Sequence, residues 1–176
     1  MGASLDEPGH YTRLRRSLSD FASPNRCPKT SLRVVLKETV RRNRVRDGIV
    51  YLQISRGAAP RDHPFPPPST LPSVVVVAKS VSRKMLEARA AKGVGVVTLP
   101  DNRWGRCDLK TVGLLPNVLA KQAAREAGAF EAWFVDEDGL VTEGTASNAW
   151  IVDAQGASQE RAISPTASFT ASRAPA

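Results

Sequence analysis

The sequence predicts an α+β protein of two domains, and two observations support this. First, two segments with helical spacing of apolar residues are followed by two segments rich in β-branched residues. Second, a strand, a helix and a hairpin follow later in one compact run. The predicted parts are a small N-terminal domain at 1–80, an interdomain connection at 81–92, a second domain at 93–156, and a tail at 157–176 that is rich in alanine and serine.

The first helix is predicted from a helix entry and a short apolar stripe. Asp6-Glu7-Pro8-Gly9 places a capping residue and a proline just before the periodic segment from His10 to Leu18. Within that segment, Tyr11, Leu14 and Leu18 follow helical spacing. We therefore expect one apolar face on this helix.

A second helix follows a loop at residues 19 to 28. Thr30 or Ser31 is expected to cap it, and it should end at about Arg44. Its predicted apolar face consists of Leu32, Val35, Leu36 and Val40. This helix is expected to serve as scaffold.

The strands of the first domain are predicted at Gly48 to Ser55 and at Val74 to Ala78, with a proline-rich loop at Phe65 to Pro72 between them. In the second domain we expect a strand at Gly93 to Leu99 and a helix from Asn117 to Ala127. Further strands are predicted within 128–135 and 140–152, and the turn of their hairpin is Asp136-Glu137-Asp138-Gly139.

Composition excludes several classes of protein. The chain has 176 residues, of which 41% are hydrophobic and 24% charged, as expected of a soluble globular protein. It has no apolar run of membrane-spanning length, and its first residues lack the plan of a signal peptide, so we expect a cytoplasmic protein. Two cysteines without metal spacing and two histidines give no metal site.

The formal charge of +8 is unevenly placed. Residues 1 to 70 hold 13 Lys and Arg against 6 Asp and Glu, whereas residues 71 to 176 hold 12 against 11. Nucleic-acid binding through residues 13–16 and 41–46 is therefore an alternative. No helix-turn-helix spacing, zinc pattern or aromatic stacking motif accompanies these arginines, so solvated helix faces are the preferred interpretation and no nucleic-acid partner is expected.

Two motifs flank the predicted helix of the second domain. The first reads Asp-Asn-Arg-Trp-Gly-Arg-Cys-Asp-Leu-Lys-Thr at residues 101–111, and the second reads Val-Thr-Glu-Gly-Thr-Ala-Ser-Asn at 141–148. Taken singly, Lys110 and Glu143 fit ordinary surface residues. Two long motifs in this order, on consecutive elements of one unit, favour a functional site that contains both.

These motifs resemble those of the fold-type-IV (class IV) pyridoxal-phosphate aminotransferase family, and within it most closely the D-amino acid aminotransferases. The resemblance implies that Lys110 binds the cofactor aldehyde covalently and that Glu143 faces the pyridine nitrogen. A lysine amine can form a Schiff base with an aldehyde. A carboxylate beside the ring nitrogen keeps it protonated, which lets the ring accept electrons from the substrate.

Two further segments carry the same resemblance. His10-Tyr11-Thr12-Arg13-Leu14 is similar to the family's His-x-x-Arg-Leu, which makes Arg13 the candidate for the cofactor phosphate. Arg61-Asp62-His63 is similar to the Arg-x-His that binds the substrate carboxylate in the D-amino acid branch, where it reaches the site of the neighbouring subunit. Arg61 and His63 are therefore candidate substrate-binding residues in a homodimer.

The resemblance implies reversible transfer of an amino group from a D-amino acid such as D-alanine to a 2-oxo acid such as 2-oxoglutarate, with pyridoxal 5'-phosphate as cofactor. A branched-chain aminotransferase or an aminodeoxychorismate lyase is the second interpretation, and Arg61 with His63 favours the first. The third is a non-catalytic basic remnant that binds a partner or nucleic acid. A bound cofactor would distinguish the third from the others.

The resemblance covers residues 5 to 156 but not all of the family's fold. The family's upstream Phe-Gly-Asp-Gly-Val-Tyr-Glu and its phosphate-binding Gly-Ile-Thr are absent from the sequence. We therefore expect a chain truncated at its start, with little or no activity. The tail is interpreted as a frameshift just after Gly156, because codons for residues 167–174, read from the third base of the Ala167 codon, allow Ile-Leu-His-Gly-Ile-Thr-Arg.

Overall fold

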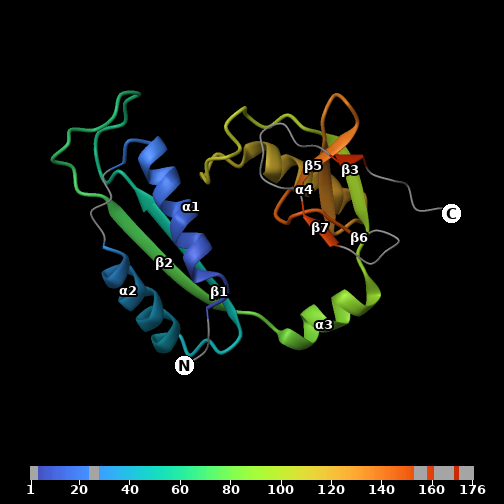
Figure 1. The fold of residues 1–176 in the computed structure, drawn as a ribbon, viewed down its shortest axis with the longest axis horizontal. Coiled ribbons are helices and arrows are strands. Elements are labelled where there is room, and N and C mark those ends of the chain that lie inside the picture. Colours follow the sequence, from blue (N-terminus) through green and yellow to red (C-terminus); the bar gives the residue numbers. More distant parts are fainter. Residues whose placement is uncertain (1–3, 24–27, 153–157, 161–168, 171–176) are drawn as a thin grey trace. The chain divides into compact units, whose positions relative to one another are not determined.

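The computed structural model describes residues 4–23, 28–152, 158–160 and 169–170. It contains the predicted mixture of helices and strands (Figure 1). The chain divides into two compact units, Met1–Ala88 and Arg89–Ala176, and the division falls inside the segment that the sequence assigns to the interdomain connection. Each unit has its own sheet and its own buried side chains.

Helix α1 (Glu7–Asp20) begins within the predicted helix entry and extends beyond the predicted segment, His10 to Leu18, at both ends. The side chain of Asp6 accepts a hydrogen bond from the backbone N–H of Gly9 at 3.2 Å, which satisfies one of the donors left open at the helix start. Tyr11 and Leu18 are buried, so the predicted apolar face packs against the rest of the unit. Beside them Ser17 is also buried.

Helix α2 (Lys29–Arg42) begins earlier than predicted. The expected cap at Thr30 or Ser31 is wrong, because Pro28 occupies the N-cap position and its carbonyl already accepts the N–H of Leu32 at 3.0 Å. Leu32 is only 2% exposed, but Val35 is 45% exposed, so the buried stripe is narrower than the apolar spacing indicated.

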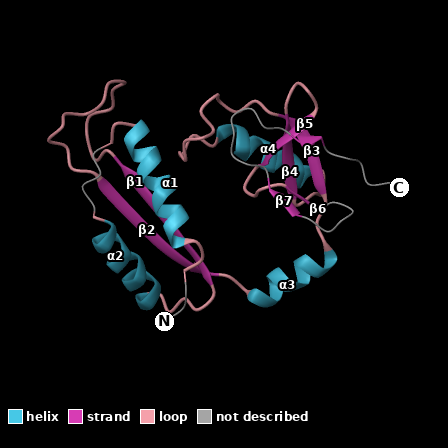
Figure 2. Ribbon diagram, viewed as in Figure 1, coloured by secondary structure: helices cyan, strands magenta, loops and turns pink. Residues whose placement is uncertain are grey.

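Strands β1 (Gly48–Ser55) and β2 (Ser73–Ser80) form an antiparallel pair in which Gly48 lies opposite Ser80 and Ser55 opposite Ser73. The prediction of both strands is confirmed, and β2 extends beyond the predicted segment at both ends. The connecting residues 56–72 form the long loop visible in Figure 2, as the prolines indicated.

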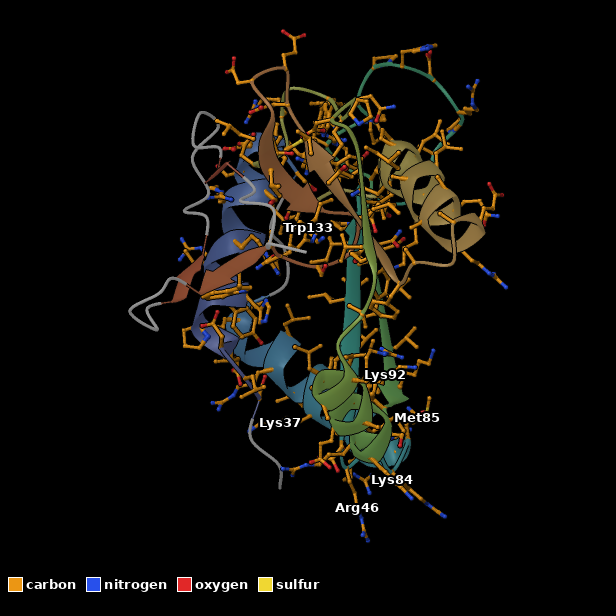
Figure 3. The ribbon with its side chains drawn as sticks, turned by 90° about the vertical axis from the view of Figure 1, so that its right-hand side faces the viewer. Lys37, Arg46, Lys84, Met85, Lys92 and Trp133 are labelled. Carbon is orange, nitrogen blue, oxygen red and sulfur yellow. The ribbon has the colours of Figure 1, made fainter. Side chains whose placement is uncertain are left out.

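Helix α3 (Arg83–Lys92) lies in the predicted connection, to which the sequence analysis assigned no secondary structure. None of its residues is buried. Figure 3 shows the side chains of Lys84, Met85 and Lys92 along this helix. Its sequence lacks an apolar stripe but is rich in Ala, Glu, Lys, Arg and Leu, so intrinsic propensity and the pair between Arg83 and Glu87 at 2.9 Å account for the helix.

The second unit is built around a four-stranded sheet in the order β3-β4-β5-β8. Strand β3 (Val96–Pro100) is parallel to β4 (Glu131–Val135), and helix α4 (Leu115–Glu126) lies between them in sequence, because a parallel pair needs a crossover connection. Strand β5 (Leu140–Gly144) is antiparallel to β4 and to β8 (Phe169–Thr170). The predicted strand, helix and hairpin are therefore present.

The core of this unit lies between α4 and the sheet. Phe134 is fully buried, and alanines on α4 and β4 allow the helix to pack closely over it. The cluster consists of Ala120, Ala124, Ala132 and Phe134, with Val97, Leu99 and Ala129 packed against it. Removal of this apolar surface from water is the main stabilising contribution here.

The β4–β5 hairpin turns at residues 136–139, as predicted. Gly139 has a φ of 79° and donates its N–H to the carbonyl of Asp136 at 3.1 Å, a backbone conformation that favours glycine. After β5 the chain turns before β6 (Trp150–Val152), which pairs with β7 (Ser158–Glu160). The predicted frameshifted tail falls mostly outside the described residues and stays a prediction.

Candidate functional site

The loop that carries the first motif begins at the end of β3 with Asp101. The backbone N–H of Asp101 donates to the carbonyl of Val135 at 2.8 Å, which continues the sheet beyond the last paired residue of β3. Its carboxylate accepts the backbone N–H of Arg103 at 3.1 Å and the Nε–H of the same residue at 2.9 Å. Asp101 therefore fixes both the backbone and the guanidinium of Arg103.

The guanidinium of Arg103 connects this loop to β5. Its Nη1 lies 2.6 Å from Oε2 of Glu143, and its Nη2 lies 2.7 Å from Oδ2 of Asp101. Nη2 also lies 3.3 Å from Oγ1 of Thr142, whose hydroxyl donates to Asp101 at 2.5 Å. The ring of Phe134 lies 4.9 Å from the guanidinium carbon, so one planar cation binds two carboxylates above an aromatic side chain.

Hydrogen bonds outweigh burial in setting the pKa values of Asp101 and Arg103. Burial by itself opposes ionisation of Asp101, but hydrogen bonds from Arg103 and Thr142 outweigh it and lower the pKa of that carboxyl to about 2. Burial likewise opposes the charged form of Arg103, and its bonds to Asp101 and Glu143 raise the pKa of the guanidinium nevertheless. Asp101 and Arg103 are therefore both charged at neutral pH, and with the carboxylate of Glu143 the three groups carry a formal charge of one negative unit.

Glu143 differs from its partners in exposure. The side chain of Arg103 is 9% exposed and that of Asp101 15%, whereas that of Glu143 is 44% exposed. Arg103 binds Oε2, and among the described residues no hydrogen bond reaches Oε1. One carboxylate oxygen is thus fixed to the protein while the other can accept a donor from a ligand.

Lys110 follows a turn that is anchored on both sides. The backbone N–H of Leu109, a buried residue, donates to the carbonyl of Arg106 at 3.1 Å. The guanidinium of Arg106 binds the carboxylate of Asp108 at 2.9 and 3.0 Å. Lys110 itself is exposed. Burial raises the pKa of the neighbouring Cys107 thiol, which therefore stays protonated at neutral pH.

The second motif folds into a tight turn after β5. The N–H of Gly144 donates to the carbonyl of Ser147 at 3.1 Å, and a Cβ at position 144 would lie 2.6 Å from that oxygen. The amide of Asn117 at the start of α4 donates to the carbonyl of Thr145 at 2.9 Å. These contacts hold the end of β5, and with it Glu143, against the helix.

A buried carboxylate binds the polar residues of this turn. Glu131, whose side chain is 5% exposed, accepts hydrogen bonds from the hydroxyls of Thr145 and Ser147, the latter at 2.9 Å. It also accepts the N–H of Ala132 at 2.9 Å, and Lys121 lies 3.2 Å away. Burial opposes its ionisation, but these partners outweigh burial and lower the pKa of Glu131. It is therefore a structural anion that binds the polar residues of the second motif.

The remaining predicted site residues belong to the first unit. Arg13 is exposed on α1, and its Nη2 lies 2.9 Å from Nδ1 of His10. Arg61 and His63 lie on the exposed loop between β1 and β2. The N–H of His63 donates to the carboxylate of Asp62 at 2.8 Å, and its side chain is 97% exposed. The structure therefore places Lys110 and Glu143 in one unit and the other three candidates in the other.

The sequence analysis gave no role to Asp101, Arg103 or Glu131. An acid and an arginine two residues apart lie on the same side of an extended chain, so the spacing of Asp101 and Arg103 was a usable signal for an ion pair. Glu131 gave no such signal, because a glutamate at the start of a strand is usually exposed. Its partners are 14 and 16 residues away and become visible only in the fold.

The described residues include no group of three or more His, Cys, Asp or Glu side chains that could bind a metal ion. In the same part of the chain, no helix is long and apolar enough to cross a bilayer.

Comparison with known protein families assigns the chain to one of them. Residues 2–159 match the sequence model of Amino-transferase class IV. The chain belongs to the class IV aminotransferase family. The family expected from the motifs at 101–111 and 141–148 is confirmed.

Two relatives show which members of the class IV aminotransferase family the chain is similar to. It is 43% identical over 145 residues to a D-alanine aminotransferase of Bacillus licheniformis, covering 82% of this chain and 49% of the relative. It is 38% identical over 141 residues to a D-alanine aminotransferase of Staphylococcus aureus (strain MSSA476), covering 80% and 49%. The chain spans about half the length of the curated relatives it matches.

Solved structures confirm the predicted fold class. A hypothetical aminotransferase from Mycobacterium tuberculosis in its apo form has a TM-score of 0.70 at 23% identity, over 90% of this chain and 56% of that one. The branched-chain amino acid aminotransferase from Escherichia coli has a TM-score of 0.67 at 20% identity, over 83% and 48%. At these identities the likeness concerns the fold alone.

Proposed function

We propose that this protein is a pyridoxal-phosphate-dependent transaminase that moves an amino group between a D-amino acid, such as D-alanine, and a 2-oxo acid, such as 2-oxoglutarate. The observation that carries the proposal is the orientation of Glu143 by Arg103 in the same unit as the exposed Lys110. The relatives at 43% and 38% identity, both D-alanine aminotransferases, support the choice of substrate.

The residues of the second unit fit the cofactor. A lysine that combines with an aldehyde must be accessible, and Lys110 is exposed on an anchored turn. An acid that accepts a ring N–H needs a fixed carboxylate with one oxygen left to accept the hydrogen bond. In Glu143, Oε2 is bound by Arg103 and the side chain is 44% exposed. When bound, pyridoxal phosphate would supply an aldehyde that combines with amines and a ring that accepts electrons.

The roles of the two residues follow from their chemistry. Lys110 would hold the cofactor through Nζ and, once the substrate amine has displaced it, would move the proton at the substrate Cα as general base. Glu143 would accept the hydrogen bond of the protonated ring nitrogen, and its negative charge would keep that proton in place. The carboxylate of Glu143 is bound through Oε2 to the guanidinium of Arg103, which leaves Oε1 to accept this hydrogen bond.

The first unit would bind the charged ends of cofactor and substrate. Arg13 is proposed to bind the phosphate, because a guanidinium offers paired donors to phosphate oxygens. Arg61 and His63 are proposed to bind the substrate carboxylate in the site of a second copy, which makes a homodimer part of the proposal. A cytoplasmic location stays a prediction.

Chemical labelling tests the cofactor assignment. The chain is mixed with pyridoxal phosphate, reduced with borohydride and mapped by mass spectrometry; the label should be found on Lys110 and be lost in K110A. The matched control is K92A, which removes an exposed lysine of α3 and should leave the label in place. A label spread over several lysines, or one that persists in K110A, would contradict the assignment.

The handedness of the substrate tests the assignment to D-amino acids. The chain is expected to have little or no sustained turnover, so the assay follows a single turnover: addition of D-alanine to the cofactor-loaded protein should release pyruvate, and L-alanine should not. Release of the 2-oxo acid from L-valine or L-leucine alone would instead favour a branched-chain aminotransferase, the type of enzyme seen in one solved relative. Release of pyruvate from aminodeoxychorismate would favour a lyase, as in another structural neighbour.

A further inference from the structure

The pair of Asp101 and Arg103 adjoins the proposed site, where Arg103 binds Glu143 and Asp101 has so far been given no role. Arg103 is nearly buried and binds Asp101 through two guanidinium nitrogens, at 2.9 and 2.7 Å. Its remaining terminal nitrogen, Nη1, lies 2.6 Å from Glu143. The guanidinium thus cannot turn away from Glu143 without breaking its bonds to Asp101.

We propose that Arg103 is a positioning residue that fixes the carboxylate of Glu143 toward the ring nitrogen of the cofactor, and that Asp101 cancels the charge that Arg103 would otherwise impose on it. This inference rests on the proposed function. It adds that two residues of the loop that carries Lys110 hold the carboxylate of Glu143 in place. Glu143 lies 40 residues beyond Arg103 in the chain.

Charge explains why the support needs two residues. Arg103 alone would neutralise Glu143 and so weaken the attraction between this carboxylate and a protonated ring. Asp101 brings the three groups to a summed charge of one negative unit, the same as an isolated glutamate. Their combined effect on Glu143 is therefore orientation, with no net loss of charge.

Orientation matters because Glu143 is half-exposed. Its side chain is 44% exposed, and a glutamate at that exposure has several rotatable bonds to restrain before it can form a directed hydrogen bond. Arg103, at 9% exposure and stacked 4.9 Å from the Phe134 ring, is the rigid partner. The hydrogen bond from a rigid buried cation restrains the mobile acid in advance of the ligand.

The test compares two ligands that differ at one ring atom: pyridoxal phosphate and its analogue with C–H in place of the ring nitrogen. A hydrogen bond to a charged group should make the first bind roughly tenfold or more tightly than the second. E143Q should reduce this ratio of dissociation constants toward one. The double variant D101N/R103Q retains the summed charge and removes the support, and it should lower the ratio at least about threefold.

The matched control is R106Q/D108N. It makes the same chemical change in the other Arg–Asp pair of the loop, which binds at 2.9 Å. This variant should change both dissociation constants by one factor and leave their ratio as in wild type. A purely structural role of Asp101 and Arg103 would likewise shift both constants together, so an unchanged ratio in D101N/R103Q would overturn the proposal.

Two further measurements protect the test from misfolding and from failure of the cofactor assignment. If D101N/R103Q does not fold, R103K serves instead. It keeps the charge but lacks the rigid fork of separate nitrogens with which Arg103 binds Asp101 and Glu143, so its ratio should also fall, and a wild-type ratio would refute the proposal. In the cofactor-free chain, the NMR signals of the Arg103 guanidinium should exchange slowly with solvent and should change in E143Q; unchanged signals would refute the pair itself.

The outcomes separate the two proposals. If Lys110 is labelled and the ratio is insensitive to Arg103, the function stands and the positioning role fails. If neither ligand binds to wild type, the proposed function fails, and the positioning role fails with it. If the ratio falls in E143Q and in D101N/R103Q but not in the control, both proposals are supported.

Discussion

Replacement of Asp101 by Asn should remove stability that the protein has at neutral pH and loses in acid. The carboxyl has a folded-state pKa of about 2 against an ordinary value of 3.8. A group whose pKa is lowered by folding stabilises the protein above its unfolded-state pKa, and this contribution disappears as the pH falls through the folded-state pKa. The relevant window for Asp101 is therefore from about pH 4 to about pH 2.

The size of the effect follows from the same difference in pKa. At about 1.4 kcal/mol per pKa unit, Asp101 contributes roughly 2 kcal/mol to the free energy of unfolding at pH 7. Its side chain is 15% exposed, so solvent screening reduces this value only slightly. D101N should therefore be less stable by roughly this amount at pH 7, and the two proteins should become equally stable near pH 2.

Urea unfolding followed by circular dichroism at pH 7, 4 and 2.5 measures this convergence. Other carboxylates also become protonated in this window, but they are the same in both proteins and cancel in the difference. The control is D138N, which makes the same chemical change at an exposed acid in the β4–β5 turn and is measured at the same pH values. A difference between wild type and D101N that is constant from pH 7 to pH 2.5 would refute the assigned ion pair.

Three further substitutions test the core and the turn of the second unit by urea unfolding. F134A should lower the free energy of unfolding by about 3–5 kcal/mol because it empties a fully buried site, whereas F130A, at a 44% exposed position, should lower it less. Equal losses would contradict the placement of Phe134 in the core. G144A should destabilise because its Cβ would lie 2.6 Å from the carbonyl of Ser147, and a neutral effect would exclude that turn. E131Q should lower the free energy of unfolding by roughly 2–3 kcal/mol, since two hydroxyls, an N–H and an ammonium lose their common anion. A loss of stability seen only below pH 4 would argue against this role of Glu131.

Elements set by local sequence were predictable. The Asp6 cap of α1, the strand Gly48–Ser55 and the turn closed by Gly139 each follow from residues within a few positions of one another. The start of α2 was misplaced because Pro28 also fits the cap position, and its carbonyl closes the first turn. Helix α3 was missed because it has no apolar stripe to detect.

The site was predictable only in part, for a physical reason. Lys110 and Glu143 could be singled out because each lies in a long motif, but Arg103 meets Glu143 across 40 residues, and Glu131 meets Ser147 across 16. These contacts depend on the pairing of β4 with β5 and on the crossover through α4, which no short segment of sequence specifies. Long-range polar partners are therefore the part of a site that a single sequence reveals least.

The second motif shows why one acid in it is accessible to a ligand while the other polar residues serve the fold. Thr142 is buried and donates to Asp101, Thr145 and Ser147 donate to the buried Glu131, and Gly144 leaves room for the turn, so these residues serve the fold. Glu143 differs from these residues because, within the part of the chain that the structure describes, only one of its carboxylate oxygens is bound, by Arg103, and its side chain is 44% exposed. A polar motif can thus bind itself to the scaffold through most of its residues and still present one oriented carboxylate to a ligand.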